Sequence, residues 1–263
     1  MIKALPLSNR RVLHLSGPDT VTFLQGLITN DAARVTDRTP IYAGMLTPQG
    51  KYLFDFLIFS DQSGGFYLDI DDSDLTDLQR RLMMYRLRAN VEITDVSDGM
   101  QIWAFSDHND SIAPDPRSSQ LGGRAILDNA PKGTSEWAFD DYNDRRIKLG
   151  IPDAQNDMIR DKYFWLECGA ERLNGVDFHK GCYVGQEQTA RMKHRATLKK
   201  GLLPFQFSGK PPAKDSDILN GAGKVIGRLH SIGDTHAIGF VRFEKIDDAL
   251  TADGVPLLAA VLE

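Results

Sequence analysis

Cys182 is the residue in this chain whose type and setting point most directly to chemistry. It lies in the segment 180–187, which reads Lys-Gly-Cys-Tyr-Val-Gly-Gln-Glu, and residues 180–200 hold six Lys or Arg but one Glu. Positive neighbours stabilise a thiolate, which is the nucleophilic and metal-binding form of cysteine. The glycines on either side favour an exposed loop over a core position. We therefore expect Cys182 to be a reactive or metal-binding group.

The sequence leaves three alternatives open for this cysteine. A free cysteine is often a small buried hydrophobe. A catalytic pair with His179 or His194 is a second alternative, although closeness in sequence does not establish side-chain geometry. A closed metal site made by Cys168, His179, Cys182 and His194 is the third, but this spacing matches no recognised zinc pattern.

The cysteine count limits what this thiol can do by itself. The chain of 263 residues contains two cysteines, Cys168 and Cys182. Two cysteines exclude a disulfide framework and any four-cysteine zinc or iron–sulfur cage built from this chain alone. An iron–sulfur cluster bound through Cys182 must therefore take its other ligands from a partner.

Charge and hydropathy narrow the classes of partner and location. The 31 basic and 36 acidic side chains leave a net charge of −5, so we expect no general attraction to nucleic acid or to an anionic membrane. No stretch is apolar enough to predict a membrane span, and the first folding pattern begins by about Val12 without a presequence before it. These features predict a cytoplasmic protein, with RNA contact through the basic run as a minor alternative.

The elements that must position Cys182 are predicted from periodicity and turn residues. Apolar runs separated by turn residues predict an antiparallel meander over 41–45, 52–59 and 66–70, and the residues 71–74 are candidate helix N-caps. The helix that follows is expected to end at about Arg88. The segment 106–119 is polar and contains two prolines, so we expect an exposed connection within a second α+β unit. Short apolar pieces from about residue 200 onward predict a small β-barrel.

Several segments together resemble the YgfZ-type folate-binding proteins, relatives of the glycine cleavage T-protein that include a mitochondrial iron–sulfur cluster assembly factor. The segment 180–187 is similar to the Lys-Gly-Cys-Tyr-x-Gly-Gln-Glu motif of this family. Supporting similarities are found in 23–31, 46–51, 150–152, 166–167 and Arg191. The resemblance implies an α+β fold with a T-protein-like arrangement of three units around a central folate channel. These units are ferredoxin-like or antiparallel α+β regions at 1–98 and 99–198 and a C-terminal β-barrel at 199–263.

The resemblance also implies a set of residues that bind tetrahydrofolate. Glu167 would accept pterin N–H groups, with a surface salt bridge as its alternative role. Tyr142 would stack on the ligand, with plain packing as its alternative. Arg191, or another member of the basic run, would meet the anionic folate tail, and Asn30 and Lys180 are included because they belong to matching segments.

One departure from the T-protein bears on the reaction. The T-protein carries two adjacent acidic residues after its hairpin, and here these positions are Phe54 and Asp55. A single carboxylate at Asp55 cannot be assumed to perform the same proton transfer, because acid–base catalysis depends on placement.

The sequence therefore favours a tetrahydrofolate-binding accessory protein that assembles or repairs iron–sulfur clusters with a scaffold or carrier protein. In that role Cys182 would be the exposed ligand to a shared cluster. The alternative is a tetrahydrofolate-dependent aminomethyltransferase or related one-carbon transferase, with Asp55 and Cys182 as its catalytic candidates.

Overall fold

The first large element of the fold is a five-stranded antiparallel sheet with two helices against one face. The computed structural model describes residues 1–129, 131–195 and 197–260. The strand order is β3-β4-β5-β2-β6, with strands β2 Arg10–Ser16, β3 Ile41–Leu46, β4 Tyr52–Ser60, β5 Phe66–Asp71 and β6 Glu92–Asp95. Helices α1 Thr20–Gln25 and α2 Leu75–Arg86 bury Leu24, Leu78 and Leu82 in one core with the sheet. The opposite face of this sheet is turned toward the middle of the molecule.

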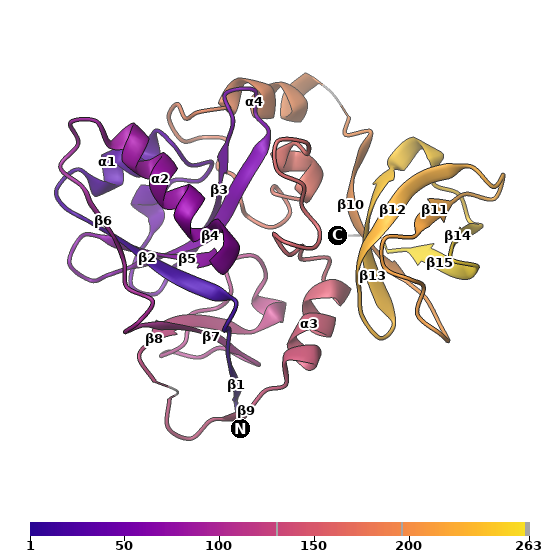
Figure 1. Ribbon diagram of the computed structural model, residues 1–263, viewed down its shortest axis with the longest axis horizontal. Helices are drawn as coiled ribbons and strands as arrows, with labels where there is room; N and C mark the ends of the chain where they lie inside the picture. Colours follow the sequence, from indigo (N-terminus) through magenta and orange to yellow (C-terminus); the bar gives the residue numbers. More distant parts are fainter. Residues whose placement is uncertain (130, 196, 261–263) are drawn as a thin grey trace.

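A second sheet has four strands and includes the N-terminal strand of the chain. Its order is β8-β7-β1-β9, with β1 Lys3–Pro6, β7 Gln101–Phe105, β8 Gly123–Leu127 and β9 Ser135–Glu136. Helix α3 Phe139–Lys148 follows and lies between this sheet and the C-terminal strands (Figure 1). Because β1 pairs with β7, the N-terminal strand belongs to the second sheet. The predicted unit boundaries at 98/99 and 198/199 stay predictions.

The third element is a closed barrel formed by the C-terminal part of the chain. Helix α4 Gln186–Arg195 precedes it, and the barrel order is β10-β13-β12-β11-β14-β15. Its strands are β10 Lys200–Gln206, β11 Asp217–Leu219, β12 Val225–Ile232, β13 His236–Arg242, β14 Leu250–Ala252 and β15 Val255–Ala259. The predicted barrel is confirmed. Its strands β11 and β14 have three residues each, which is too short for a pattern that sequence can reveal.

Two local predictions need correction. Helix α2 ends at Arg86 rather than at Arg88, because Leu87 takes a positive φ of 44° that cannot continue a helix. The segment 106–119 is not exposed throughout, because Asp115 and Arg117 are 3% and 7% exposed. Their mutual ion pair allows both charged side chains to be buried, and the composition of the segment conceals this pairing.

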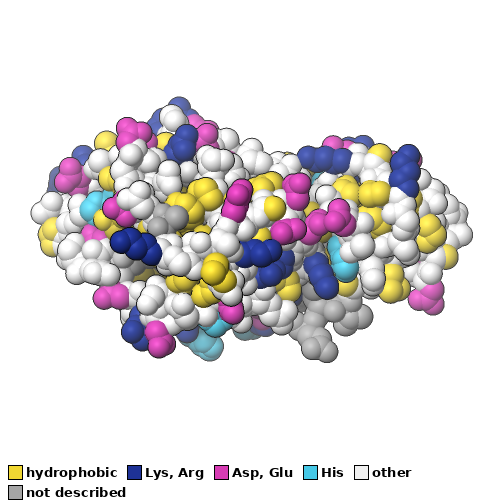
Figure 2. All heavy atoms as spheres, turned by 90° about the horizontal axis from the view of Figure 1, so that it is seen from below, with side chains coloured by type: hydrophobic (Ala, Val, Ile, Leu, Met, Phe, Trp, Pro, Cys, Tyr) yellow, Lys and Arg dark blue, Asp and Glu magenta, His cyan; other side chains and the backbone are white. Residues whose placement is uncertain are grey.

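One hydrophobic core connects all three elements. It includes Val12 from β2, Ile102 from β7, Ile147 from α3 and Leu202 from β10, so the elements pack as one body. Charged side chains of both signs are interspersed over the face seen in Figure 2. Among the described residues, no helix has the length and apolarity needed to cross a membrane.

Candidate functional site

Lys180 holds the loop that carries Cys182 against the rest of the protein. The Lys180 ammonium donates to the backbone carbonyls of Gln25, Ile28 and Asn30, at 2.9, 2.6 and 2.8 Å. Burial lowers the pKa of Lys180 to about 8. The first lysine of the basic run therefore points into the protein and connects the loop to the last residue of α1 and to the segment that follows it.

A close backbone contact fixes the other end of the same loop. Gly185 has a φ of +85°, and a Cβ at this position would lie 2.5 Å from the Thr47 carbonyl oxygen and 3.2 Å from the Gly50 Cα. Gly50 has a φ of +77° in the hairpin between β3 and β4. Both glycines are required because neither backbone geometry nor space admits a side chain. The loop of residues 180–187 (the motif loop) and the hairpin at 46–51, which the sequence indicated separately, are thus in direct contact.

Cys182 is left without a packing role in this loop. It is exposed, whereas Cys168 is buried at the end of the 3₁₀ helix Trp165–Cys168. Burial raises the pKa of the Cys168 thiol well above its usual value, so Cys168 remains protonated and inert. Among the described residues, no group of three or more His, Cys, Asp or Glu side chains could hold a metal ion. The alternative of a closed metal site made by Cys168, His179, Cys182 and His194 is therefore not formed among these residues.

A cavity of about 400 Å³ lies where the two sheets, α3 and the barrel meet. Its wall includes two of the predicted site residues, Asp55 from β4 and Tyr142 from α3. Barrel residues Ser231 and Ile232 close one side. This volume falls within the ~300–1,000 Å³ range of small-molecule sites, which are often found where domains meet.

Asp55 is buried and hydrogen-bonded in the wall of this cavity. The hydroxyls of Tyr42 and Tyr52 donate to its two oxygens at 3.0 and 2.8 Å. Burial raises the pKa of Asp55 despite the opposing effect of Arg10. The neighbouring Phe54 packs on the opposite face of the sheet, in the core with the helices.

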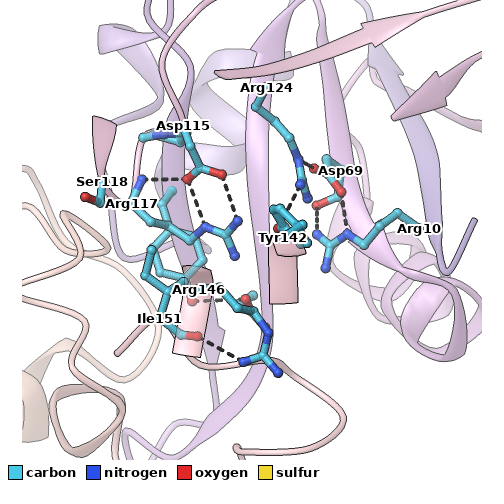
Figure 3. A network of polar contacts seen from close by, with 12 residues as sticks. Arg10, Asp69, Asp115, Arg117, Ser118, Arg124, Tyr142, Arg146 and Ile151 are labelled. Atoms are coloured by element: carbon cyan, nitrogen blue, oxygen red, sulfur yellow. Dashed lines mark hydrogen bonds and ion pairs between the residues drawn. The ribbon is translucent and has the colours of Figure 1, made fainter. Parts of the chain in front are cut away.

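Four buried arginines line the same cavity, and Figure 3 shows them with their polar partners. Their side chains are between 2% and 8% exposed, and they are Arg10, Arg117, Arg124 and Arg146. Asp69 accepts from Arg10 Nε at 2.5 Å and from Arg124 Nε at 2.7 Å. The Arg10 and Arg124 guanidiniums hold the pKa of Asp69 below its usual value, although burial opposes this effect.

The other two arginines are held in a similar way. Arg117 makes a two-point contact with Asp115, at 3.0 and 2.8 Å. Arg146 donates to Asp157 at 2.9 Å and to the Ser231 hydroxyl at 2.8 Å, which connects α3 to the barrel. Each guanidinium therefore has a fixed orientation at the cavity wall.

The remaining predicted ligand-binding residues do not line this cavity. Glu167 is buried and accepts from the Phe164 N–H at 3.0 Å, and its other oxygen lies 3.6 Å from Lys200 Nζ. The Asn30 amide donates to the Tyr42 and Asn174 carbonyls, both at 2.8 Å. Arg191 lies on α4 and contacts Gln188. The structure thus brings Asp55 and Tyr142 together and holds Glu167, Asn30, Lys180, Arg191 and Cys182 at other places.

The four cavity arginines were missed by the sequence reasoning. They come from β2, β8, α3 and the segment before β8, and no local motif joins them. Arg10, at the start of a strand, and Arg146, beside Arg145, read as ordinary surface charges. Only the burial of all four side chains in one place identifies them, and the sequence carries no signal of that burial.

The barrel and the full chain have relatives among known proteins. Residues 199–263 match the family model described as the C-terminal β-barrel domain of CAF17. Iron–sulfur cluster assembly factor IBA57 homologues, named as mitochondrial, are 31% identical in Neurospora crassa and 34% in Mycosarcoma maydis, each over 80% of this chain. The chain spans 55% and 59% of the length of these two relatives. The homologue from Aspergillus fumigatus is 29% identical over 94% of this chain and 72% of its own length.

These names correct one prediction. The relatives are named as mitochondrial, which contradicts the expected cytoplasmic location. That expectation relied on the lack of a long apolar stretch and on a folding pattern that begins by about Val12, and neither feature identifies the compartment of a protein.

The fold itself matches a known structure. The glycine cleavage system aminomethyltransferase T from Bartonella henselae superimposes with a TM-score of 0.78 at 13% identity, over 98% of this chain and 84% of the other. At this identity the match establishes the fold and not the activity. The predicted fold class is confirmed: the chain has the T-protein fold with a closed C-terminal barrel, and its sequence is similar to iron–sulfur cluster assembly factors.

Proposed function

We propose that this protein is an accessory factor in iron–sulfur cluster assembly. The observation that carries the proposal is the sequence similarity to proteins named as iron–sulfur cluster assembly factors, over 80% of the chain in two relatives and 94% in a third. The T-protein fold alone would fit several functions, because folds are reused for unrelated chemistry.

In this proposal Cys182 supplies one ligand to a cluster that a partner protein also holds. Lys180 and Gly185 have structural roles that hold the loop in place, whereas Cys182 is exposed and has no such role. One thiolate cannot hold a cluster that takes four ligands, so a scaffold or carrier protein must supply the others. The cluster is thus cargo that passes between proteins.

Replacement of each cysteine tests this role in cells that lack the native copy of the protein. Cys182→Ser should lower the activity of iron–sulfur enzymes to the level of cells without the protein. Cys168→Ala is the matched control, since it removes the buried thiol and leaves the exposed one. Normal enzyme activity in Cys182→Ser cells, at an unchanged protein level, would contradict the proposal.

Tetrahydrofolate is proposed as the small-molecule ligand, and the central cavity has the chemistry to hold it. Its wall carries the carboxyl group of Asp153, which can accept pterin N–H groups, and the aromatic ring of Tyr142. The arginines of the wall can meet the carboxylates of the folate tail. When bound, tetrahydrofolate is a carrier of one-carbon units.

A folate titration followed by tryptophan fluorescence tests both the cavity and the Glu167 prediction. Tyr142→Ala should weaken binding, because Tyr142 lines the cavity. Glu167→Ala decides whether Glu167 also contacts the pterin: loss of binding would support that role, and unchanged binding would remove Glu167 from the site. Unchanged affinity of Tyr142→Ala would contradict the placement of folate in this cavity.

A binding role suits the arrangement around Asp55 better than aminomethyl transfer. Both Asp55 oxygens already accept tyrosine hydroxyls, and Phe54 packs away from the cavity in the helix-side core. A turnover assay with an aminomethyl-lipoyl carrier protein and tetrahydrofolate is therefore expected to give the background rate.

A further inference from the structure

A cluster of apolar side chains lies in water at the C-terminal end of helix α2. Met83, Met84 and Leu87 are 46%, 72% and 87% exposed, and we call them the α2 patch. The methionines precede Leu87 by four and three residues, which is the spacing of neighbours on one side of a helix. Leu78 and Leu82 of the same helix are buried against the first sheet, so the patch is not part of that core. Scattered exposed apolar residues are ordinary, whereas a cluster of them marks a contact surface.

The backbone at Leu87 is strained. Its φ of 44° and ψ of −105° lie in a region that favours glycine, because a side chain crowds the backbone there. Strained residues persist where the surrounding structure stabilises them, and they are concentrated at functional sites. The Leu87 side chain is almost fully in solvent, so its own contacts do not offset the strain. The chain thus holds a leucine outward at a position where glycine would be more favourable.

Hydrogen bonds fix the turn that follows Leu87. The Ala89 N–H donates to the Arg86 carbonyl at 2.7 Å, and the Asn90 N–H donates to the Asp19 carboxylate at 2.8 Å. Asp19 directly precedes α1, so the turn is attached to the start of that helix. A patch held in one geometry can bind a partner without the entropic cost of ordering a loop.

Positive charge surrounds the α2 patch. Residues 80–92 contain four arginines and one acidic residue. Arg80 is paired with Asp77 at 2.6 Å. No described carboxylate forms an ion pair with the other three, Arg81, Arg86 and Arg88. Three guanidiniums beside the patch can therefore meet acidic groups from outside the chain.

Two kinds of occupant match the α2 patch poorly. A second copy of the chain in a two-fold contact would place the same arginines of both copies against one another, and like charges repel. A lipid membrane would need a broad apolar face, but the apolar side of α2 is already buried in the core through Leu78 and Leu82. An acidic protein segment with apolar side chains matches both the charge and the apolar surface. The flexible, polarizable methionines can adapt to such a segment.

We propose that the α2 patch binds an amphipathic acidic segment of a partner protein. Apolar side chains of that segment would cover Met83, Met84 and Leu87, and its Asp or Glu side chains would meet the surrounding arginines. Helix α2 lies in the part of the molecule away from the barrel (Figure 1), and none of its residues lines the central cavity. The inference does not depend on Cys182 as a cluster ligand, so the two can fail independently.

Photo-cross-linking in cells tests the proposal with the full chain. p-Benzoylphenylalanine in place of Met84 should cross-link to a protein segment in which apolar residues three or four apart are interspersed with Asp or Glu. The same amino acid in place of Lys210, an exposed residue between β10 and β11, is the control and should not capture that segment.

Binding of a synthetic peptide with the sequence of the captured segment connects it to individual residues. Leu87→Gly should weaken binding roughly tenfold, because it removes an apolar contact. Its melting temperature should equal or exceed that of wild type, since glycine accepts the positive φ. Arg88→Gln should weaken binding roughly threefold and reduce its dependence on salt. Arg228→Gln, which changes an exposed arginine of the barrel, is the control and should bind as wild type does.

Three results would overturn the inference. Cross-linking at Met84 no stronger than at Lys210 would show that no partner covers the patch. Cross-links to lipid or to a second copy would assign another occupant; binding to phosphatidylcholine–phosphatidylserine vesicles, or a dimer in analytical ultracentrifugation, would identify which. Wild-type affinity of both Leu87→Gly and Arg88→Gln would separate the captured segment from the patch. None of these results affects the cysteine test of the proposed function.

Discussion

The shared carboxylate of Asp69 allows a quantitative test of the network around the cavity. Asp69 is fully buried on β5 and accepts from Arg10 on β2 and from Arg124 on β8, so it connects the five-stranded sheet to the four-stranded one. The substitution Asp69→Asn keeps the size of the side chain and removes its charge. Two buried guanidiniums then lose their counter-charge. Loss of one partner of a buried ion pair costs ~3–5 kcal/mol, so we expect a decrease of at least about 3 kcal/mol in unfolding free energy.

Urea denaturation followed by tryptophan fluorescence measures this decrease. Asp217→Asn is the matched control, because Asp217 also lies on a strand and faces an arginine, Arg228, at 3.6 Å. Both partners of that pair are more than half exposed, so its loss should cost less than about 1 kcal/mol.

The pH dependence of the unfolding free energy provides a second test of the role of Asp69. The folded-state pKa of Asp69 lies below its ordinary value of 3.8, so folding favours the ionised form. Its stabilising contribution is therefore complete above pH 3.8 and is lost as pH falls through the folded pKa. The difference between wild type and Asp69→Asn should shrink below pH 4. Equal destabilisation by Asp69→Asn and Asp217→Asn at neutral pH would refute the reasoning.

Two further predictions concern the motif loop. Gly185→Ala should lower the melting temperature, because its Cβ would meet the Thr47 carbonyl at 2.5 Å, whereas Gly181→Ala, with no atom within 4 Å, should leave it unchanged; a larger effect at Gly181 would contradict the contact. Titration with Ellman's reagent should detect one reactive thiol, Cys182, in the folded protein and a second, Cys168, after addition of urea. Fast reaction of two thiols without denaturant would contradict the burial of Cys168.

The parts of the fold that sequence could predict are those with a local cause. The meander over β3, β4 and β5 could be predicted because each strand is a mainly apolar run and each turn between them contains Gly. The barrel is visible for the same reason, except at β11 and β14, where three residues are too few for a period. The pairing of β1 with β7 could not be predicted, because nothing in the N-terminal residues indicates a distant partner.

The candidate site also has features that sequence could predict and features that it could not. The exposure of Cys182 follows from its glycine-flanked loop, and the structure agrees with it. The basic run predicted a local positive field around Cys182, yet Lys180 points inward and Lys193 contacts Glu171. A cluster of buried arginines lies instead in the cavity wall. It depends on tertiary ion pairs between residues far apart in sequence, such as Arg124 with Asp69, and no sequence pattern reports such pairs.

The central claim is that Cys182 is a ligand to an iron–sulfur cluster shared with another protein. Visible absorption and circular dichroism of a [2Fe–2S]-loaded carrier protein test it directly, with and without this protein present. Wild type and Cys168→Ala should change the cluster spectrum, because a new thiolate enters the coordination sphere, and Cys182→Ser should leave the spectrum of the carrier unchanged. The same spectral change with Cys182→Ser as with wild type would contradict the claim.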